Sequence, residues 1–308
     1  MYNSNNMPSI QSKIVRSFLK ANQSRQPLDL NAIPAYRAKF ERDLRILFPT
    51  LSSRHVRHVE IAGLAVDEVS PLHSPRYTIL YIHGGAFALG SSRSYRQHLV
   101  RIARICNARV LSVDYELSPE HPFPYASNQI LKAWPAICAQ YNLRPEKLVW
   151  MGDSAGANIA LSTALRLRDS DPSMLPGCIA LQSPGLDATL DGESYTKNKE
   201  RDVILTPAAL EFYMKTYVQD HDKNDPFVSP VFADLRGLPP LLIHIGSDEL
   251  QLSSSLKLHE HAKRDGLDVE LFVGEAMWHN WHLFAGIVPE AKDALYRMRD
   301  FIDERIAE

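Results

Sequence analysis

Six short apolar runs, separated by longer stretches with helical periodicity, constrain the fold of this chain most strongly. The runs do not alternate polar with apolar residues, as expected for strands covered on both faces. They span residues 77–82, 110–113, 148–151, 178–181, 241–245 and 269–273. Helical patterns such as 94–105 and 155–168 lie between them. This alternation predicts an α/β fold with a mostly parallel sheet and helices on both faces. An earlier stretch, 55–62, has Val59 and Ile61 at period two and is consistent with an antiparallel edge pair.

Two regions do not follow this alternation. Residues 1–50 carry helical patterning before the sheet begins, as in 33–47, and residues 188–225 form a polar, charged insert with a helical run at 207–217. We expect 1–50 and 188–225 to form a helical cap, over a catalytic domain made of 51–187 and 226–308. The hypothesis is that the two cap regions pack together as a mobile lid over the site.

Composition excludes several classes of protein. The 308 residues carry 34 Lys and Arg against 36 Asp and Glu, a formal charge of −2. This balance gives no reason to expect a nucleic acid or an anionic membrane as a partner. No uncharged apolar run approaches the roughly 20 residues of a membrane span, and residues 1–12 lack the apolar core of a signal peptide. We therefore expect a cytoplasmic protein. Its cysteines, Cys106, Cys138 and Cys178, lack CxxC spacing and are expected to be buried apolar side chains.

The segment Gly-Asp-Ser-Ala-Gly at 152–156 follows an apolar strand and precedes a helix. This context fits the nucleophile-elbow motif G-x-S-x-G, in which a sharp turn pushes the serine hydroxyl out over the sheet. Side chains at 152 and 156 would collide with neighbouring backbone, so glycine is needed there. The start of the following helix adds N–H donors and a dipole that favours negative charge. The pattern predicts Ser154 as a nucleophile, although the bare motif also fits an ordinary glycine-bounded helix start.

A second glycine-rich loop, His-Gly-Gly-Ala-Phe at 83–87, directly follows the predicted strand 77–82. Such a loop can turn backbone N–H groups into the crevice above the sheet, where acyl transfer needs donors for an oxyanion. The candidate oxyanion-hole residues are Gly84, Gly85 and Ala86 in this loop, and Ala155 directly after the nucleophile. His83 itself is expected to brace its own loop.

With these motifs in order, the sequence resembles the hormone-sensitive-lipase-like (bacterial family IV) carboxylesterases of the α/β-hydrolase superfamily. The segments 114–124, 152–158, 183–187 and 238–249 resemble further family blocks, and the match runs from about 77 to 285. The resemblance implies an α/β-hydrolase fold, a Ser-His-Asp triad, short acyl substrates, no cofactor and frequent dimers. In the family, the oxyanion donors map to Gly85 and Ala86. Ala86 stands where the family usually has a third glycine, and Ala157 replaces a common glycine after the elbow.

Four histidines follow in the second half of the chain and compete for the role of general base. His279 lies on a loop after the predicted strand 269–273, and this position together with the family's M-x-H pattern favours it. His282 is the alternative, whereas His259 and His261 fall in a pattern typical of a surface helix. His279 and His282 together also suggest a metal site, but further ligands with suitable spacing are absent nearby, so we expect no metal.

The acid is expected to precede the histidine in this fold. Asp248 stands at the end of the apolar run 241–245 and is the predicted acid, which would hold His279 in the correct tautomer. Glu249 is the obvious competitor. Asp187 is a third candidate, for which a structural role near the cap is favoured. Asp114, Glu120 and Asp153 are expected to form a structural network beneath the site.

The predicted function is hydrolysis of a small carboxylic ester through an acyl-enzyme, with Ser154, His279 and Asp248 as the triad. An amidase or lactonase with the same triad remains an alternative, because a fold does not fix a reaction. A non-catalytic protein that binds small molecules is a further alternative, which predicts a missing triad member. The expected partner is a small-molecule ester, with a homodimer as a possible assembly.

Overall fold

In the computed structural model, which describes residues 7–24, 27–49 and 56–306, eight strands form one sheet in the order β1-β2-β4-β3-β5-β6-β7-β8. Strands β1 and β2 are antiparallel to each other, and β2 is antiparallel to β4. The other neighbours are parallel. The strands are β1 Val56–Ile61, β2 Leu64–Val69, β3 Thr78–Ile82, β4 Arg109–Asp114, β5 Leu148–Asp153, β6 Cys178–Gln182, β7 Leu241–Gly246 and β8 Val269–Gly274.

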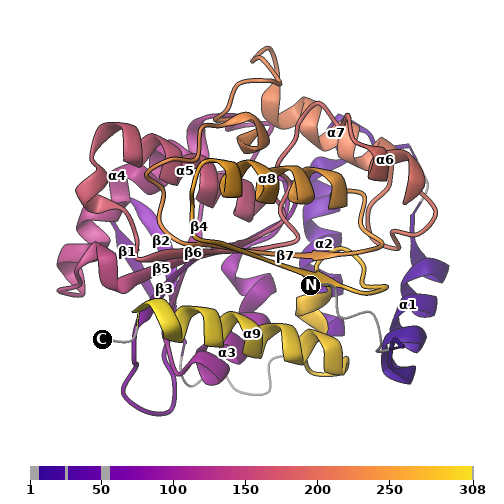
Figure 1. Ribbon diagram of the computed structural model, residues 1–308. Helices are drawn as coiled ribbons and strands as arrows, with labels where there is room; N and C mark the ends of the chain where they lie inside the picture. The colour runs from indigo at the N-terminus through magenta and orange to yellow at the C-terminus, as the bar shows by residue number, and fades with distance from the viewer. Residues whose placement is uncertain (1–6, 25–26, 50–55, 307–308) are drawn as a thin grey trace.

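Helices cover both faces of this sheet (Figure 1). On one face lie α4 Tyr125–Gln140, α5 Ala155–Ser170 and α8 Leu252–Arg264. On the other lie α3 Ser92–Cys106 and α9 Pro289–Ile306. Parallel strands need such crossovers, and their helices exclude water from both faces of the sheet.

The two faces of the sheet bury two separate hydrophobic cores, and β3 shows how one strand serves both. Leu80 and Ile82 belong to the core under α4 and α5. Ile79 and Tyr81 belong to the core under α3 and α9. All four side chains are at most 1% exposed, as the period of two along a doubly covered strand requires.

The structure confirms the predicted α/β fold. Each of the six apolar runs forms a strand, with bounds within two residues of the prediction. The predicted edge pair is also present, because β1 pairs with β2 and places Val59 opposite Val66; residue 55 lies outside the described residues. Consequently β3, β4, β5, β6, β7 and β8 all point their carboxyl ends at one edge, where ligands bind in open α/β sheets.

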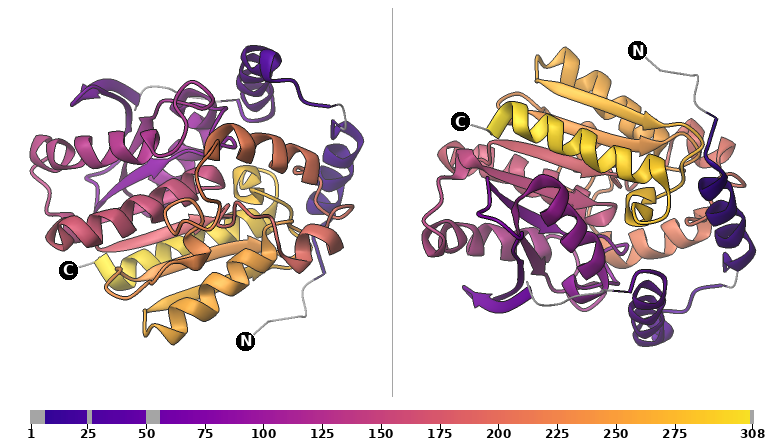
Figure 2. Two further views of the ribbon diagram at one scale, coloured as in Figure 1. Left: turned by 90° about the horizontal axis from the view of Figure 1, so that it is seen from above. Right: turned by 90° about the horizontal axis from the view of Figure 1, so that it is seen from below.

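Four helices lie outside the alternation of strand and helix, at one end of the molecule. They are α1 Ile10–Asn22, α2 Ile33–Leu47, α6 Glu193–Lys197 and α7 Pro207–Val218. Figure 2 shows α1 and α2 at the same end of the molecule in both views. The two predicted cap regions contact each other, because the side-chain amide of Gln23 donates to the carbonyls of Asp202 and Leu205 at 3.1 and 3.2 Å. Residues 1–6, 25–26 and 50 of the predicted cap lie outside the described residues.

Within the described ranges, the structure contains no helix that is both long and apolar enough to cross a membrane. The three cysteines are free and buried, as predicted.

Candidate active site

Ser154 occupies the sharp turn between β5 and α5. Its backbone has φ 51° and ψ −118°, a conformation that a residue with a Cβ adopts only under strain. The flanking glycines explain how the turn closes. A Cβ on Gly156 would lie 2.0 Å from the carbonyl oxygen of Ile82, and one on Gly152 would lie 2.6 Å from the carbonyl oxygen of Gly156. The elbow that the sequence predicts is therefore present, with Ser154 above the end of β5.

A chain of hydrogen-bonding atoms begins at the hydroxyl of Ser154. The Oγ atom lies 2.8 Å from Nε2 of His279, and Nδ1 of His279 lies 2.8 Å from Oε2 of Glu249. The three side chains are at most 8% exposed. The carboxylate accepts a hydrogen bond from the N–H at Nδ1, so Nε2 is left to accept one from the hydroxyl of Ser154. This is the arrangement that activates a serine for nucleophilic attack.

The carboxylate that contacts His279 is that of Glu249, and the prediction that Asp248 makes this contact is wrong. Asp248 points the other way, toward two guanidinium groups. Its Oδ2 lies 2.5 Å from Nη1 of Arg16 in α1, and its Oδ1 pairs with Arg201 in the segment between α6 and α7. Asp187, the third candidate, accepts from Thr189 in a local turn.

The turn after β7 is the physical reason for this exchange of roles. Oε1 of Glu249 accepts the N–H of Gly246 at 2.6 Å and the hydroxyl of Ser183 at 2.7 Å. These bonds fold the longer side chain back under His279, where it is completely buried. The carboxylate of Asp248, also buried, is directed away from His279 toward Arg16 and Arg201.

Charge around His279 favours its protonated form. Burial lowers the pKa of His279, but the hydrogen bond and negative charge of Glu249, with further charge from Asp202 and Asp153, outweigh burial and raise it. Asp202 is itself buried, which raises its pKa to about 6 despite the opposing charge of His279. The imidazolium that forms when the base accepts a proton is therefore stabilised within the site.

The glycine-rich loop after β3 lies beside Ser154 at the same cavity. Gly85 has φ 121° and Ala86 has φ 54°, and both line the cavity that contains Ser154 and His279. Ala86 thus adopts a left-handed conformation, which costs a residue with a Cβ roughly 1–2 kcal/mol. Ala155 is the first residue of α5, where an N–H has no partner within the helix.

Gly84, by contrast, is not available as an oxyanion donor, so its inclusion in the predicted hole is wrong. Its N–H donates to Oδ1 of Asp153 at 2.8 Å. A Cβ at this position would lie 2.3 Å from Oδ2 of the same carboxylate. Gly84 therefore anchors the loop and does not face the reacting atoms.

Asp153 connects four segments of the site, a role that the sequence indicates only as part of a network. Besides Gly84, it accepts the hydroxyls of Tyr81 and Tyr95 at 2.8 and 2.9 Å and the amide of Asn280 at 2.6 Å. Burial raises the pKa of Asp153, and these donors oppose the rise. One carboxylate thereby links the elbow to the glycine-rich loop 83–87 and to the loop that carries His279.

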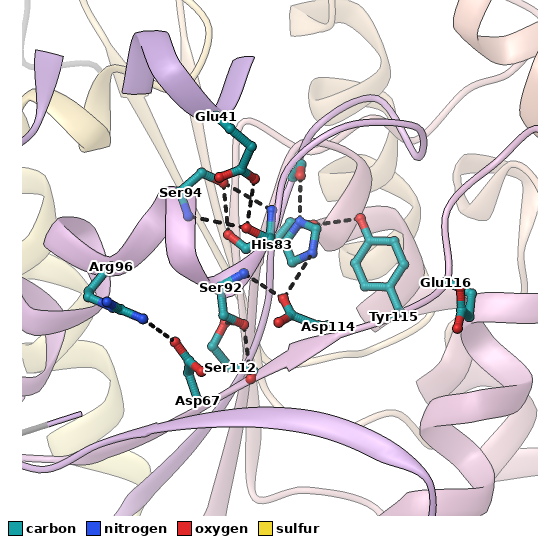
Figure 3. Close-up of polar contacts among 12 residues, drawn as sticks. Glu41, Asp67, His83, Ser92, Ser94, Arg96, Ser112, Asp114, Tyr115 and Glu116 are labelled. Atoms are coloured by element: carbon teal, nitrogen blue, oxygen red, sulfur yellow. Dashed lines mark hydrogen bonds and ion pairs between the residues drawn. The ribbon is translucent and has the colours of Figure 1, made fainter. Parts of the chain in front are cut away.

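A second set of contacts supports the glycine-rich loop 83–87 (Figure 3). His83 stacks on Tyr115 with ring centroids 4.5 Å apart, and the hydroxyl of Tyr115 donates to the carbonyl of His83 at 2.8 Å. Asp114 accepts the N–H of Ser92 at 2.6 Å at the start of α3. His83 therefore supports its own loop, in agreement with its predicted role.

Ser154, the candidate nucleophile, lines a cavity of about 250 Å³. Among the described residues that line it there is no Asp, Glu, Lys or Arg. Its walls come from α1, α2, α7 and the loop of His279, through Leu19, Phe40, Leu44, Phe48, Leu210, Tyr213, Leu283 and Phe284 among others. Both regions outside the sheet alternation thus contribute to the cavity.

The other residues that the sequence brought forward lie away from this cavity. His282 is fully buried and its Nε2 lies 3.3 Å from Nδ1 of His244, so it does not reach Ser154. The two tryptophans near His279 in the sequence, Trp278 and Trp281, are also fully buried, in the core under α9, and do not line the cavity. Among the residues that the structure describes, no three His, Cys, Asp or Glu side chains are grouped to hold a metal ion.

Comparison with known proteins identifies the family of the chain. The model of the alpha/beta hydrolase fold family matches residues 79–283. An esterase of Acinetobacter venetianus is 38% identical over 287 residues, which cover 92% of this chain and 93% of that protein. An acetyl-hydrolase of Streptomyces hygroscopicus is 33% identical over 237 residues, 77% of this chain and 79% of its own.

Solved structures give the same result at the level of the fold. The crystal structure of EstE5 superposes with a TM-score of 0.90 at 30% identity, covering 97% of this chain and 100% of its own. An esterase from the bacterial hormone-sensitive lipase family gives 0.87 at 29% identity, covering 98% and 100%. The chain therefore belongs to the alpha/beta hydrolase fold family, and within it to the hormone-sensitive-lipase-like carboxylesterases.

Proposed function

We propose that the chain hydrolyses small carboxylic esters through an acyl-enzyme, with Ser154 as nucleophile, His279 as base and Glu249 as the orienting acid. The observation that carries the proposal is the pair of 2.8 Å contacts that joins Oγ of Ser154 through His279 to Glu249. Such contacts lie within the reach that proton transfer requires.

Each step has an assigned group in this chain. Oγ of Ser154 attacks the carbonyl carbon while Nε2 of His279 takes its proton. The negative charge on the carbonyl oxygen is received by the N–H groups of Gly85, Ala86 and Ala155, each of which is worth about 3 kcal/mol in such sites. The tetrahedral intermediate then expels the alcohol, which takes the proton from His279.

The second half of the reaction repeats these steps with water. His279 takes a proton from water as its oxygen attacks the acyl carbon of the ester on Ser154. The C–O bond to Ser154 then breaks and its Oγ recovers the proton, releasing the carboxylic acid. Glu249 stays ionised throughout and stabilises the imidazolium.

The size and polarity of the cavity favour substrates with short acyl or alcohol groups. Its volume of about 250 Å³ lies below the range of about 300–1,000 Å³ typical of pockets for drug-sized ligands. Uncharged, apolar walls favour neutral substituents, because a buried charge without a partner is costly. We further propose that α1 and α2, with the segment 188–225, act as the cap that closes this cavity.

The test is hydrolysis of p-nitrophenyl esters from acetate to palmitate by the wild type, Ser154→Ala and the control Ser162→Ala. Ser162 lies in the same helix α5, where its hydroxyl donates to the carbonyl of Phe227. We expect fast turnover of short chains by the wild type and the control, and background rates for Ser154→Ala. An inactive wild type on every ester, or an active Ser154→Ala, would contradict the proposal. Matched amides and lactones then distinguish an esterase from the other acyl-transfer enzymes.

A further inference from the structure

Asp248 lies in a strongly charged environment that the proposed mechanism does not use. Its side chain is 4% exposed and pairs with Arg16 and Arg201. Burying a carboxylate is costly unless opposite charge compensates it. Two arginines from separate segments provide that compensation, and the carboxylate belongs to the residue directly before the proposed catalytic acid.

We propose that Arg16, Asp248 and Arg201 form a latch that positions Glu249 and joins the two cap segments to the catalytic domain. The proposal rests on the proposed function, because it concerns the acid of that triad. None of the three touches Ser154 or His279, so they are positioning residues. We call the three side chains the cap latch.

Arg16 is the centre of the cap latch because its guanidinium binds three different segments. Nη1 lies 2.5 Å from the carboxylate of Asp248 and donates to the carbonyl of Ala276 at 3.2 Å. Nη2 donates to the carbonyl of Arg201 at 2.7 Å. One side chain of α1 thus binds three segments: the loop after β7 that carries Asp248 and Glu249 (the acid loop), the loop after β8 that carries His279, and the segment between α6 and α7. A planar guanidinium with several donors suits such a junction better than an ammonium group does.

The loops that carry the acid and the base are bound to each other at the same point. The N–H of Asp248 donates to the carbonyl of Met277 at 3.2 Å, two residues before the base. The N–H of Ala276 donates to the hydroxyl of Ser247 at 2.8 Å. A shift of Asp248 therefore moves the backbone on both sides of the contact between Glu249 and His279.

The segment that carries Arg201 also binds the backbone of Glu249 and of the residues near it in the acid loop. The side-chain amide of Asn198 donates to the carbonyls of Ser247 and Glu249 at 3.0 and 2.8 Å. The carboxylate of Asp202 accepts the N–H of Leu250 at 3.1 Å. Side chains of the segment between α6 and α7 thus bind the backbone around Glu249, and the cap latch adds a charged contact. Arg201 is 55% exposed against 27% for Arg16, so we expect Arg16 to contribute more.

The first experiment compares kcat and KM for p-nitrophenyl butyrate across Arg16→Gln, Asp248→Asn, the double variant and the control Lys20→Gln. Lys20 lies one turn further along α1 and forms no ion pair with a described residue. We expect kcat to fall about tenfold for each latch variant, with KM changed less than threefold and the control unchanged. The double variant should be no slower than the slower single variant, because the pair acts as one unit. Arg16→Lys keeps the positive charge but loses the planar group with several donors, so its kcat should lie between those of the wild type and Arg16→Gln.

The pH profile separates positioning from loss of folded protein. His279 faces Glu249, Asp202 and Asp153, and the hydrogen bond to Glu249 is the main cause that raises its pKa. A loosened acid loop weakens that bond, so the acidic limb of kcat/KM should shift to lower pH in Arg16→Gln and Asp248→Asn. A smaller folded fraction would reduce the rate at every pH and leave the limb in place.

Hydrogen exchange of the full chain provides a test that needs no turnover. Amides of α1 and of residues 247–250 should exchange faster in Arg16→Gln and Asp248→Asn than in the wild type or Lys20→Gln. Unchanged exchange in these segments would overturn the cap latch whatever the activity. The cap latch would also be overturned if the acidic limb of kcat/KM stayed at the same pH in the variants, or if kcat fell only in proportion to the folded fraction. An inactive wild type contradicts the proposed function instead, and the exchange data then decide the latch alone.

Discussion

Replacing Glu249 by glutamine should remove nearly all activity through a change in the tautomer of His279. Oε1 of Glu249 receives two donors, the N–H of Gly246 at 2.6 Å and the hydroxyl of Ser183 at 2.7 Å. The amide oxygen of the glutamine must take that position, since an NH₂ group there would face both donors. The NH₂ group then faces Nδ1 of His279 and can only donate to it. The ring proton moves to Nε2, which can no longer accept the proton of Ser154.

The magnitude follows from the same change in a related triad. Converting the orienting acid to its amide in a serine protease lowers kcat about 10⁴-fold through the wrong tautomer. At about 1.4 kcal/mol for each factor of ten, this corresponds to about 5.5 kcal/mol of transition-state stabilisation. We expect a loss of that order for Glu249→Gln and only about tenfold for Asp248→Asn, because Asp248 has no contact with the base.

The assay is the initial rate of p-nitrophenyl acetate hydrolysis at the pH optimum, with Ser154→Ala as the floor. Circular dichroism and thermal melting should verify that both variants are folded. The assignment of the acid would be refuted if Asp248→Asn lost more activity than Glu249→Gln, or if Glu249→Gln stayed within tenfold of the wild type.

Three further predictions follow from the pKa values and the packing. The acidic limb of kcat/KM should lie above about 6.5, the ordinary value for histidine, because the base must be neutral and the charge of Glu249 outweighs burial to raise the pKa of His279; a pH profile with its limb at or below 6.5 would contradict this. Gly156→Ala should lower the free energy of unfolding in urea by about 3 kcal/mol or more, since its Cβ would lie 2.0 Å from the carbonyl oxygen of Ile82; a loss below about 1 kcal/mol would show that the elbow tolerates a side chain. Burial lowers the pKa of His98 to about 3, so the folded state keeps it neutral and stability is lost as pH falls from about 6.5 toward 3. The loss of unfolding free energy between pH 7 and pH 5 should therefore be about 2 kcal/mol smaller in His98→Gln than in the wild type, and equal losses would contradict the assignment.

The sheet could be predicted because its information is local. A strand such as β5 is covered on both faces, so a continuous apolar run, 148–151, marks it in the sequence, and residues 148–153 are all buried. The elbow is equally local, because the backbone angles of Ser154 need glycines two positions away on either side. The helices α2 and α7 follow in the same way from their own periodicity.

The oxyanion hole was predictable as a loop but not as a set of donors. Which N–H faces the cavity depends on which one is already bonded elsewhere. Gly84 is excluded by a carboxylate 69 positions away, on Asp153. The sequence places that aspartate next to Ser154, but the four donors that converge on it come from β3, α3 and two loops. Only the assembled fold decides that Asp153 binds Gly84 and leaves Gly85 and Ala86 at the cavity.

Which carboxylate contacts His279 depends on residues that lie far apart in the sequence. Two adjacent carboxylates follow β7, and a rotation of one residue in the turn would exchange their directions. The arginines that hold Asp248 outward lie in α1 and before α7, 232 and 47 positions earlier in the chain. Neither arginine stands in a motif, and an isolated turn would not distinguish the two carboxylates. The turn is selected because the outward carboxylate finds two positive charges while the inward one finds the ring of His279. Exchanging the partners would leave the guanidinium of Arg16 without its buried counter-ion, so the cap segments help to decide which carboxylate reaches the base.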